Sequence, residues 1–309
     1  MINFRYHVVS LTAVFLALAI GLVVGTAALN GPVSENLRTN LEALKKDNDV
    51  RRDQVNQLRE ELNSGQDFAT EVAPVVLAGK LATRKIAVVS LPGADESADG
   101  VVKMLNVAGA TLTARVTLEE KFFDPNYTTE LLDLADQSSQ PSIPVTSLPR
   151  NSDGVETASA LLALTLLQGA TNPTPDDVTA VLTGLSEAGY VATEEAAAGG
   201  AEAVVLVSSE PATDKEATRK NQSAVTVANQ FYQRRPLVVA GDGAGEGNLV
   251  SGVRGDPTLV KEISTVDNVS TVQGQVATAM ATTERLVQNK VGQYGLAAGA
   301  TSMVPSAAP

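Results

Sequence analysis

The sequence predicts an α/β protein that one transmembrane helix anchors to a membrane and a parallel coiled coil holds as a dimer. Three observations support this fold class: an uncharged apolar run from Val8 to Leu29, a heptad pattern over 33–64, and alternating strand-like and helix-like segments over 66–291. We therefore expect, in order, a cytoplasmic N-terminus at 1–7, a transmembrane helix at 8–29, the coiled coil, an exported α/β domain with a mostly parallel open sheet, and a disordered tail at 292–309.

The apolar run is long enough to cross a bilayer. At 1.5 Å of rise per residue, Val8 to Leu29 forms a helix of about 33 Å, close to the thickness of the hydrocarbon core. A cleaved signal peptide is the alternative, although its apolar region is usually shorter. Arg5 precedes the run and the next cation is Arg38, so the positive-inside rule favours a cytoplasmic N-terminus and export of the rest.

The heptad pattern predicts a parallel homodimer. The apolar positions are Leu37, Leu44 and Leu58 at d, and Leu41, Val55 and Leu62 at a. Asn48 occupies a further a position, where a buried amide pairs best with its own copy in a parallel two-stranded coil, and Arg51 is a defect at d. Cations fill every e position, so an antiparallel pair would repel, whereas Asp47 at g would face Arg52 of a parallel second copy. A solvated single helix, or a seam for another protein, is the alternative.

Small residues in the apolar run give a second, weaker dimer signal. Ala17, Gly21 and Gly25 are four residues apart, a spacing that lets two helix backbones approach closely in lipid. We expect Gly31 and Pro32 to break the helix, so the two dimer signals would form separate seams.

Short apolar segments rich in valine predict buried parallel strands in the exported domain. They are Ile86–Leu91, Thr111–Leu118, Ala203–Ser208, Leu237–Ala240 and Ile263–Val266. Helices are expected between them, at 96–108, 128–136, 154–168, 176–189, 215–233 and 271–290. This alternation is typical of an open sheet with helices on its faces.

Two loops are candidate sites at the carboxyl edge of the predicted sheet. The glycine-rich loop 241–247 follows a strand, but its spacing and its acidic residues favour a flexible turn over a phosphate site. Asp267 and Asn268 follow the strand before the last long helix, where α/β proteins bind ligands, so they form a possible ligand or partner edge. Turn and cap chemistry also explains them, because Ser270 and Gln273 have capping-box spacing.

Composition excludes several kinds of site. The chain has no cysteine, and its one histidine is His7, so the exported domain lacks a thiol nucleophile, a histidine-dependent triad and a metal–histidine site. Met104, Met280 and Met303 are too scattered to predict a Cu(I) site, and the first two are expected to fill the core. A net charge of −12 disfavours nucleic acid as a partner. We predict no catalytic residue, metal site or cofactor.

The chain resembles the actinobacterial MctB-like "copper transporter" family. The opening Met1 to His7, the heptad segment, and the closing Ser264 to Val269 with Tyr294-Gly295 carry the resemblance, which covers nearly the whole chain. It implies an envelope protein of mycobacteria and corynebacteria, linked in some members to copper export or an outer-membrane channel. In other members, called SteB, it implies cell separation alongside the membrane protein SteA.

The two implied functions need different architectures. One helix per chain would require an oligomer larger than a dimer to enclose a pore. We therefore expect first a dimeric, non-enzymatic scaffold in the plasma membrane that acts with a SteA-like partner in cell separation and control of peptidoglycan hydrolysis. Copper transport or efflux, with an outer-membrane location, is the alternative, and a carboxylate-based envelope enzyme is the third.

Overall fold

The computed structural model describes residues 4–169, 173–194, 197–243 and 245–306. For residues 28–34 it describes the backbone only. The chain divides into two compact units, Met1–Gly65 and Gln66–Pro309. Residues 1–3 of the predicted N-terminal segment and 307–309 of the predicted tail lie outside the described residues.

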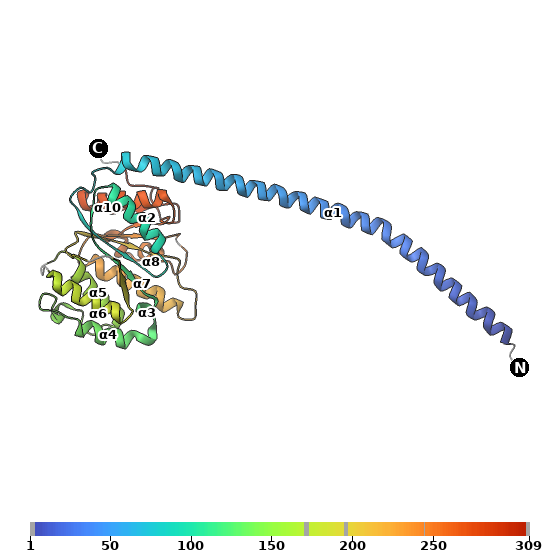
Figure 1. Ribbon diagram of the computed structural model, residues 1–309, viewed down its shortest axis with the longest axis horizontal. Helices are drawn as coiled ribbons and strands as arrows, with labels where there is room; N and C mark the ends of the chain where they lie inside the picture. Colours follow the sequence, from blue (N-terminus) through green and yellow to red (C-terminus); the bar gives the residue numbers. More distant parts are fainter. Residues whose placement is uncertain (1–3, 170–172, 195–196, 244, 307–309) are drawn as a thin grey trace. The chain divides into compact units, whose positions relative to one another are not determined.

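Helix α1 (Phe4–Leu77) runs through both the predicted span and the predicted coiled coil without interruption (Figure 1). The predicted break at Gly31 and Pro32 is therefore wrong. Proline lacks one backbone N–H and disfavours a helix interior, but apolar and heptad segments on either side favour the helix strongly enough to continue it. The helix also passes Pro74 and ends only at Leu77, beyond the predicted end of the coil, because Ala73 and Leu77 are buried in the core of the second unit.

A seven-stranded sheet forms the centre of the second unit. Its strands are β1 (Lys85–Ser90), β2 (Thr111–Leu118), β3 (Val191–Thr193), β4 (Ala203–Val207), β5 (Leu237–Ala240), β6 (Ser264–Val266) and β7 (Gln293–Tyr294). Their spatial order is β3-β2-β1-β4-β5-β6-β7. Every neighbouring pair is parallel except β2 and β3, which confirms the predicted mostly parallel sheet.

The direction of winding reverses between β1 and β4. After β1 the chain crosses to β2 on one side, whereas after β4 it crosses to β5 on the other. The loops that follow the carboxyl ends of β1 and β4 therefore lead in opposite directions. In open α/β sheets this reversal leaves a crevice where ligands commonly bind.

Helices cover both faces of the sheet, as Figure 1 shows. One face packs against α2 (Asp95–Val107), α10 (Val272–Gln288) and the end of α1. The other packs against α3 (Glu120–Phe123), α4 (Thr128–Gln137), α5 (Gly154–Leu166), α6 (Pro175–Glu187), α7 (Ala217–Tyr232), α8 (Leu249–Gly255) and α9 (Leu259–Glu262). Two short 3-10 helices, η1 (Pro125–Tyr127) and η2 (Val145–Ser147), lie in the connections.

Strand side chains alternate between the two cores. In β1, Ala87 and Val89 belong to the larger core, and Ile86 and Val88 to the smaller one. All four are fully buried. Burial on both faces explains why the strands are continuous apolar runs instead of alternating ones.

The C-terminal segment differs from its prediction. The predicted tail begins at 292, yet Gln293 and Tyr294 form β7 beside β6, and Thr301 donates a backbone hydrogen bond to Gln293 at 2.7 Å. The predicted disorder rested on a composition of small residues. Such residues can still be ordered when their backbone groups have partners, and here the sheet edge provides them.

Candidate functional site

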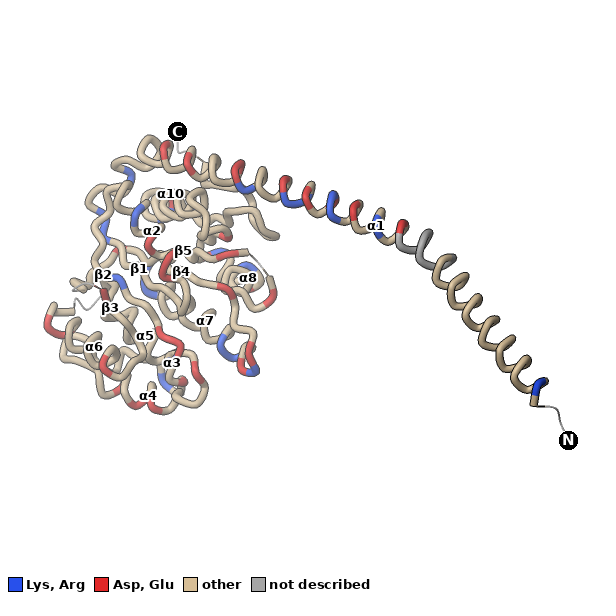
Figure 2. The backbone as a smooth tube through the Cα atoms, turned by 45° about the vertical axis from the view of Figure 1, so that its right-hand side comes forward, with Lys and Arg blue, Asp and Glu red and all other residues tan. Residues whose placement is uncertain are grey.

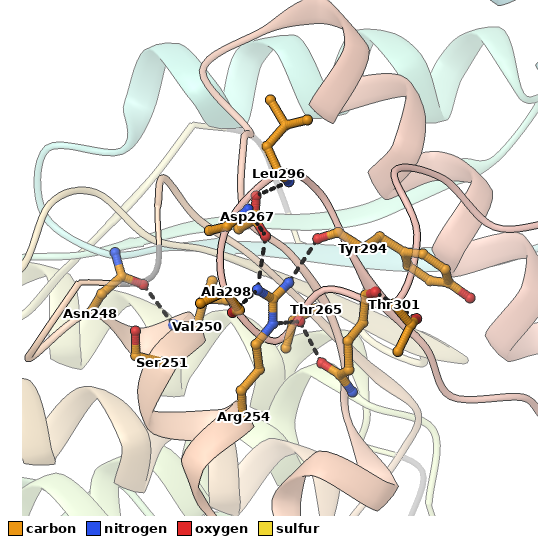
Figure 3. A network of polar contacts seen from close by, with 12 residues as sticks. Asn248, Val250, Ser251, Arg254, Thr265, Asp267, Tyr294, Leu296, Ala298 and Thr301 are labelled. Atoms are coloured by element: carbon orange, nitrogen blue, oxygen red, sulfur yellow. Dashed lines mark hydrogen bonds and ion pairs between the residues drawn. The ribbon is translucent and has the colours of Figure 1, made fainter.

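Asp267, one of the two predicted edge residues, forms a buried ion pair at the carboxyl end of β6. Its carboxylate lies 2.8 Å from Nη1 of Arg254, which α8 presents, and both side chains are almost fully buried. The backbone N–H of Leu296 donates to the same carboxylate at 2.7 Å (Figure 3). The backbone N–H of Ala297 donates to it at 3.1 Å. These contacts give Asp267 a structural role, and its predicted ligand role stays a prediction.

Arg254 distributes its other hydrogen bonds over the same end of the sheet. Its guanidinium donates to Thr265 Oγ1 at 2.8 Å, to the carbonyl of Tyr294 at 2.8 Å and to the carbonyl of Ala298 at 3.1 Å (Figure 3). One side chain therefore joins α8, β6, β7 and the turn after β7. Arg254 is not among the predicted site residues, because its only local signal is a single cation after the mostly apolar segment Leu249 to Val253.

Asn268, the second predicted edge residue, belongs to the cap of α10. Its Nδ2 donates to Thr271 Oγ1 at 3.3 Å, and Thr271 Oγ1 in turn accepts from the backbone N–H of Gly274 at 3.1 Å. The N-cap is therefore Thr271, and the predicted cap at Ser270 is one residue too early. The buried Oδ1 of Asn268 has no hydrogen-bond partner among the described residues.

The glycine-rich loop packs against the start of the α10 segment. Asp242 Oδ1 accepts from the backbone N–H of Ser270 at 2.9 Å, and the Asp242 carbonyl accepts from Asn248 Nδ2 at 2.7 Å. Gly243 and Gly247 have positive φ angles, which a turn of this kind requires and other residues rarely adopt. Ala244 lies outside the described residues. These contacts agree with the turn interpretation.

The predicted dimer stripe is exposed along α1. Leu37, Leu41, Leu44, Val55, Leu58 and Leu62 are between 46% and 65% exposed, and Asn48 is exposed between them. Arg51 at the d position forms an exposed ion pair with Asp47 on its own helix at 3.0 Å. A stripe of this kind at heptad spacing offers apolar surface to a second helix.

The N-terminal part of α1 meets the requirements of a membrane span. Phe4–Ala27 contains an 18-residue window with a mean hydropathy of 2.6, and none of that window is buried within the chain. Figure 2 shows charged residues concentrated in the later part of the helix and a single cation near the start. At Gly21 and Gly25, an added Cβ would have no atom within 4 Å, so this face is open to a neighbouring helix.

Metal ligands do not gather in the described part of the chain. No group of three or more His, Asp or Glu side chains there has a metal-binding arrangement, and the chain has no cysteine. Met104 is buried in the smaller core and Met280 packs against it, which confirms their predicted core roles. Met303 is 60% exposed.

The comparisons with known proteins cover almost the whole chain. A family model described as "Copper transport outer membrane protein, MctB" matches residues 1–305. A protein of Mycobacterium tuberculosis named "Copper transporter MctB" is 29% identical over 314 residues, covering 99% of this chain and 100% of that protein. The Mycobacterium leprae protein of the same name is 30% identical over 325 residues, covering 98% and 99%. The predicted resemblance is confirmed, and this chain belongs to the MctB family.

Proposed function

We propose that this chain is a single-pass, membrane-anchored component of an envelope copper transport system, and that its exported α/β domain acts on partner proteins without catalysis. The observation that carries the proposal is a match to a copper transport family over residues 1–305, in a chain whose described residues include one helix long and apolar enough to span a membrane. Copper transport, the alternative among the predicted functions, therefore comes before the cell-separation scaffold, because the family description and the relatives' names refer to copper transport.

The single span supports an accessory role over an independent channel. A membrane-spanning helix satisfies its own backbone hydrogen bonds, but one helix encloses no path for an ion. Two copies in a parallel dimer would still provide only two helices. We therefore assign the copper pathway to a higher oligomer or to a separate membrane protein.

Side-chain chemistry also supports an indirect role for the exported domain. Cu(I) prefers several soft sulfur ligands or imidazoles held together. This chain has no cysteine, a single histidine at position 7 and four methionines in total, of which Met104 is buried in the core. The domain is thus better suited to binding another protein than to carrying the metal.

The anchor and the exposed stripe favour one arrangement. Arg5 lies before the span, which supports, by the positive-inside rule, the proposed arrangement with the N-terminus in the cytoplasm and the α/β domain outside the plasma membrane. The heptad stripe then forms a parallel dimer just outside the membrane, which holds two α/β domains near each other and raises the effective concentration of paired contacts. The outer-membrane location in the family description is the alternative.

Complementation of a deletion strain tests the proposal. The full chain is expected to restore growth in copper and normal copper content, whereas a variant lacking residues 34–62 restores both only in part because dimerisation is lost. A variant with the α/β domain removed is expected to restore neither. A deletion strain with the same copper sensitivity and copper content as its parent strain would contradict the proposal.

A scaffold that binds a SteA-like membrane protein in cell separation is the second candidate. The uncovered apolar stripe of α1 is the observation that favours a protein partner of some kind. Crosslinking in cells, followed by identification of the captured proteins, distinguishes the two candidates. Capture of a SteA-like protein, with a cell-separation defect and normal copper content in the deletion strain, would favour this second function.

A further inference from the structure

Charged side chains are distributed unequally between the two edges of the sheet. Within five residues before the parallel strands, the acids are Glu202 and Glu262, and the cations are Lys80, Arg84, Arg234, Arg235, Lys261 and Lys290. Within five residues after the same strands, the cation is Lys121, and the acids are Asp95, Glu119, Glu120, Glu210, Asp242 and Asp267. The chain has a net charge of −12, so the amino edge of the sheet is a local exception that attracts anions.

A pocket of ≈ 330 Å³ lies at this amino edge, where α5 and α7 end. The two helices pack side by side (Figure 1). Leu167, which follows α5, is bridged to Ala201 just before β4, and Arg235 lies two residues before β5. The pocket is lined by Ser147, Ala163, Leu164, Leu167, Gln168, Gly169, Gln233, Arg234 and Arg235.

Both arginines present their guanidinium groups at the wall of this pocket. Arg234 is exposed, and its Nη2 donates to the carbonyl of Ser147 at 3.0 Å. Arg235 is half-buried, and its Nε donates to the carbonyl of Gln168 at 2.5 Å. Ser147 and Gln168 line the same pocket, so these bonds fix the charged ends of the two side chains there. A guanidinium has five N–H groups, and most of those on each arginine stay available to a ligand.

No carboxylate neutralises the two arginines in the described part of the chain. No acidic residue lines the pocket, and none of the ion pairs among the described residues includes Arg234 or Arg235. The carboxyl ends of α5 and α7 supply some negative charge, equivalent to about half an elementary charge each. Two arginines therefore leave an excess of about one positive charge, which suits an anion with a single charge.

The rest of the pocket indicates what this anion carries. Ala163 and Leu164 of α5 and Leu167 after it form an apolar wall, and all three are buried. The planar N–H fork of a guanidinium matches the two oxygens of a carboxylate. A volume of ≈ 330 Å³ is at the lower end of the range for small-molecule pockets, so the ligand is small.

We infer that this pocket binds a small organic monocarboxylate, whose charged group pairs with Arg234 and Arg235 and whose short apolar body lies against Leu164 and Leu167. The inference is independent of copper transport and of dimer formation, because it depends only on the ends of α5 and α7.

Ligand-observed saturation-transfer NMR on the full chain in nanodiscs of zwitterionic lipid tests it at neutral pH. Valerate and its amide, valeramide, share an apolar body and differ in charge, and empty nanodiscs provide the background. Valerate is expected to receive saturation from the protein and valeramide to receive none above background. Acetate has the same charge without the apolar body and is expected to bind at least roughly threefold more weakly than valerate. Absence of valerate binding, or equal binding of valeramide or of acetate, would overturn the inference.

Variants of the two arginines locate the binding site. Arg234→Gln with Arg235→Gln is expected to weaken valerate binding by at least roughly tenfold, the range for hydrogen bonds to charged groups. Arg234→Gln alone leaves the bond between Arg235 and Gln168 in place and is expected to weaken binding roughly threefold. This single variant decides the question if the double variant does not fold, which its melting temperature shows.

Arg219→Gln with Lys261→Gln is the matched control. It removes the same charge as the double variant, and one of its two sites lies on α7, but neither side chain lines the pocket. Its affinity for valerate is expected to stay within about twofold of the wild type, because salt screens distant exposed charges. Equal affinity of the wild type and the arginine variants, or an equal loss in this control, would contradict the proposed site.

Discussion

At the scale of single residues, the Arg254–Asp267 pair has the clearest predicted effect on stability. Asp267→Ala leaves the guanidinium of Arg254 buried without its anion and frees the N–H groups of Leu296 and Ala297. Breaking a buried ion pair on one side costs about 3–5 kcal/mol, so we expect a loss of that order in the free energy of unfolding. Denaturant titration of the α/β domain signal in the full chain measures it.

Two variants control this experiment. Glu42→Gln removes the exposed pair between Arg38 and Glu42 and is expected to change stability by less than about 1 kcal/mol. Arg254→Met with Asp267→Ala removes both charges together and is expected to recover part of the loss, because no charge then remains buried. A loss for Asp267→Ala no larger than that for Glu42→Gln would show that the pair contributes little.

Acid should weaken the fold through carboxylates such as Asp256. Hydrogen bonds from the N–H groups of Leu259 and Thr258 to its Oδ1 lower the pKa of Asp256 below its ordinary value. A lowered pKa in the folded state gives stability that is present above the unfolded pKa of about 3.9 and is lost as pH falls through the folded value. Asp256→Asn should therefore show a shallower fall in melting temperature between about pH 5 and 3. An equal slope for the wild type and Asp256→Asn would contradict the assignment.

The sequence could place Asp267 and Asn268 but could not identify their partners. Position after a strand and before a long helix was enough to locate both at the carboxyl edge of the sheet. The cation that neutralises Asp267 lies on α8, and the N–H groups that bind it lie beyond β7. Such contacts depend on how distant segments meet, so a local pattern contains no information about them.

At the scale of elements, length decided which parts of the fold could be predicted. The five predicted strands correspond to β1, β2, β4, β5 and β6, and the six predicted helices to α2, α4, α5, α6, α7 and α10. The missed strands, β3 and β7, have 3 and 2 residues, and the missed helices α3, α8 and α9 have 4, 7 and 4. Elements this short show at most about two periods of a hydrophobic pattern, too few to distinguish a helix or strand from a loop, and neighbouring elements stabilise them.

The predicted coiled coil makes the oligomeric state depend on Asn48. Asn48→Leu in the full chain replaces a polar a residue that favours two parallel strands, so we expect tighter association together with trimers or tetramers beside the dimer. Light scattering on the protein in detergent, corrected for the micelle, measures the oligomeric state. Asn56→Leu is the matched control, because position 56 is a b position on the solvent face, and it should leave the wild-type dimer unchanged. A wild-type chain that stays monomeric at micromolar concentrations would contradict the dimer.

At the scale of the whole molecule, the fold and the family give different kinds of information. The open sheet with its crevice occurs in proteins of many functions, so the fold alone does not specify copper transport. The family match extends over the anchor, the helix and the α/β domain together. The proposed accessory role would use each of them: the anchor would locate the protein, the helix would pair it with a second copy, and the domain would provide a rigid binding surface.

This role predicts how the purified protein behaves in a membrane. The full chain reconstituted alone in liposomes is expected to give no copper flux above that of empty liposomes, because a dimer provides two spans and neither encloses a path. A variant with Gly21 and Gly25 replaced by leucine is a control for packing between spans: it should alter helix association while flux stays at background. The opposite outcome would be copper-selective flux through the wild-type chain that this variant abolishes. It would show that the span itself conducts copper, because only close packing of several copies at these glycines could then line a pore.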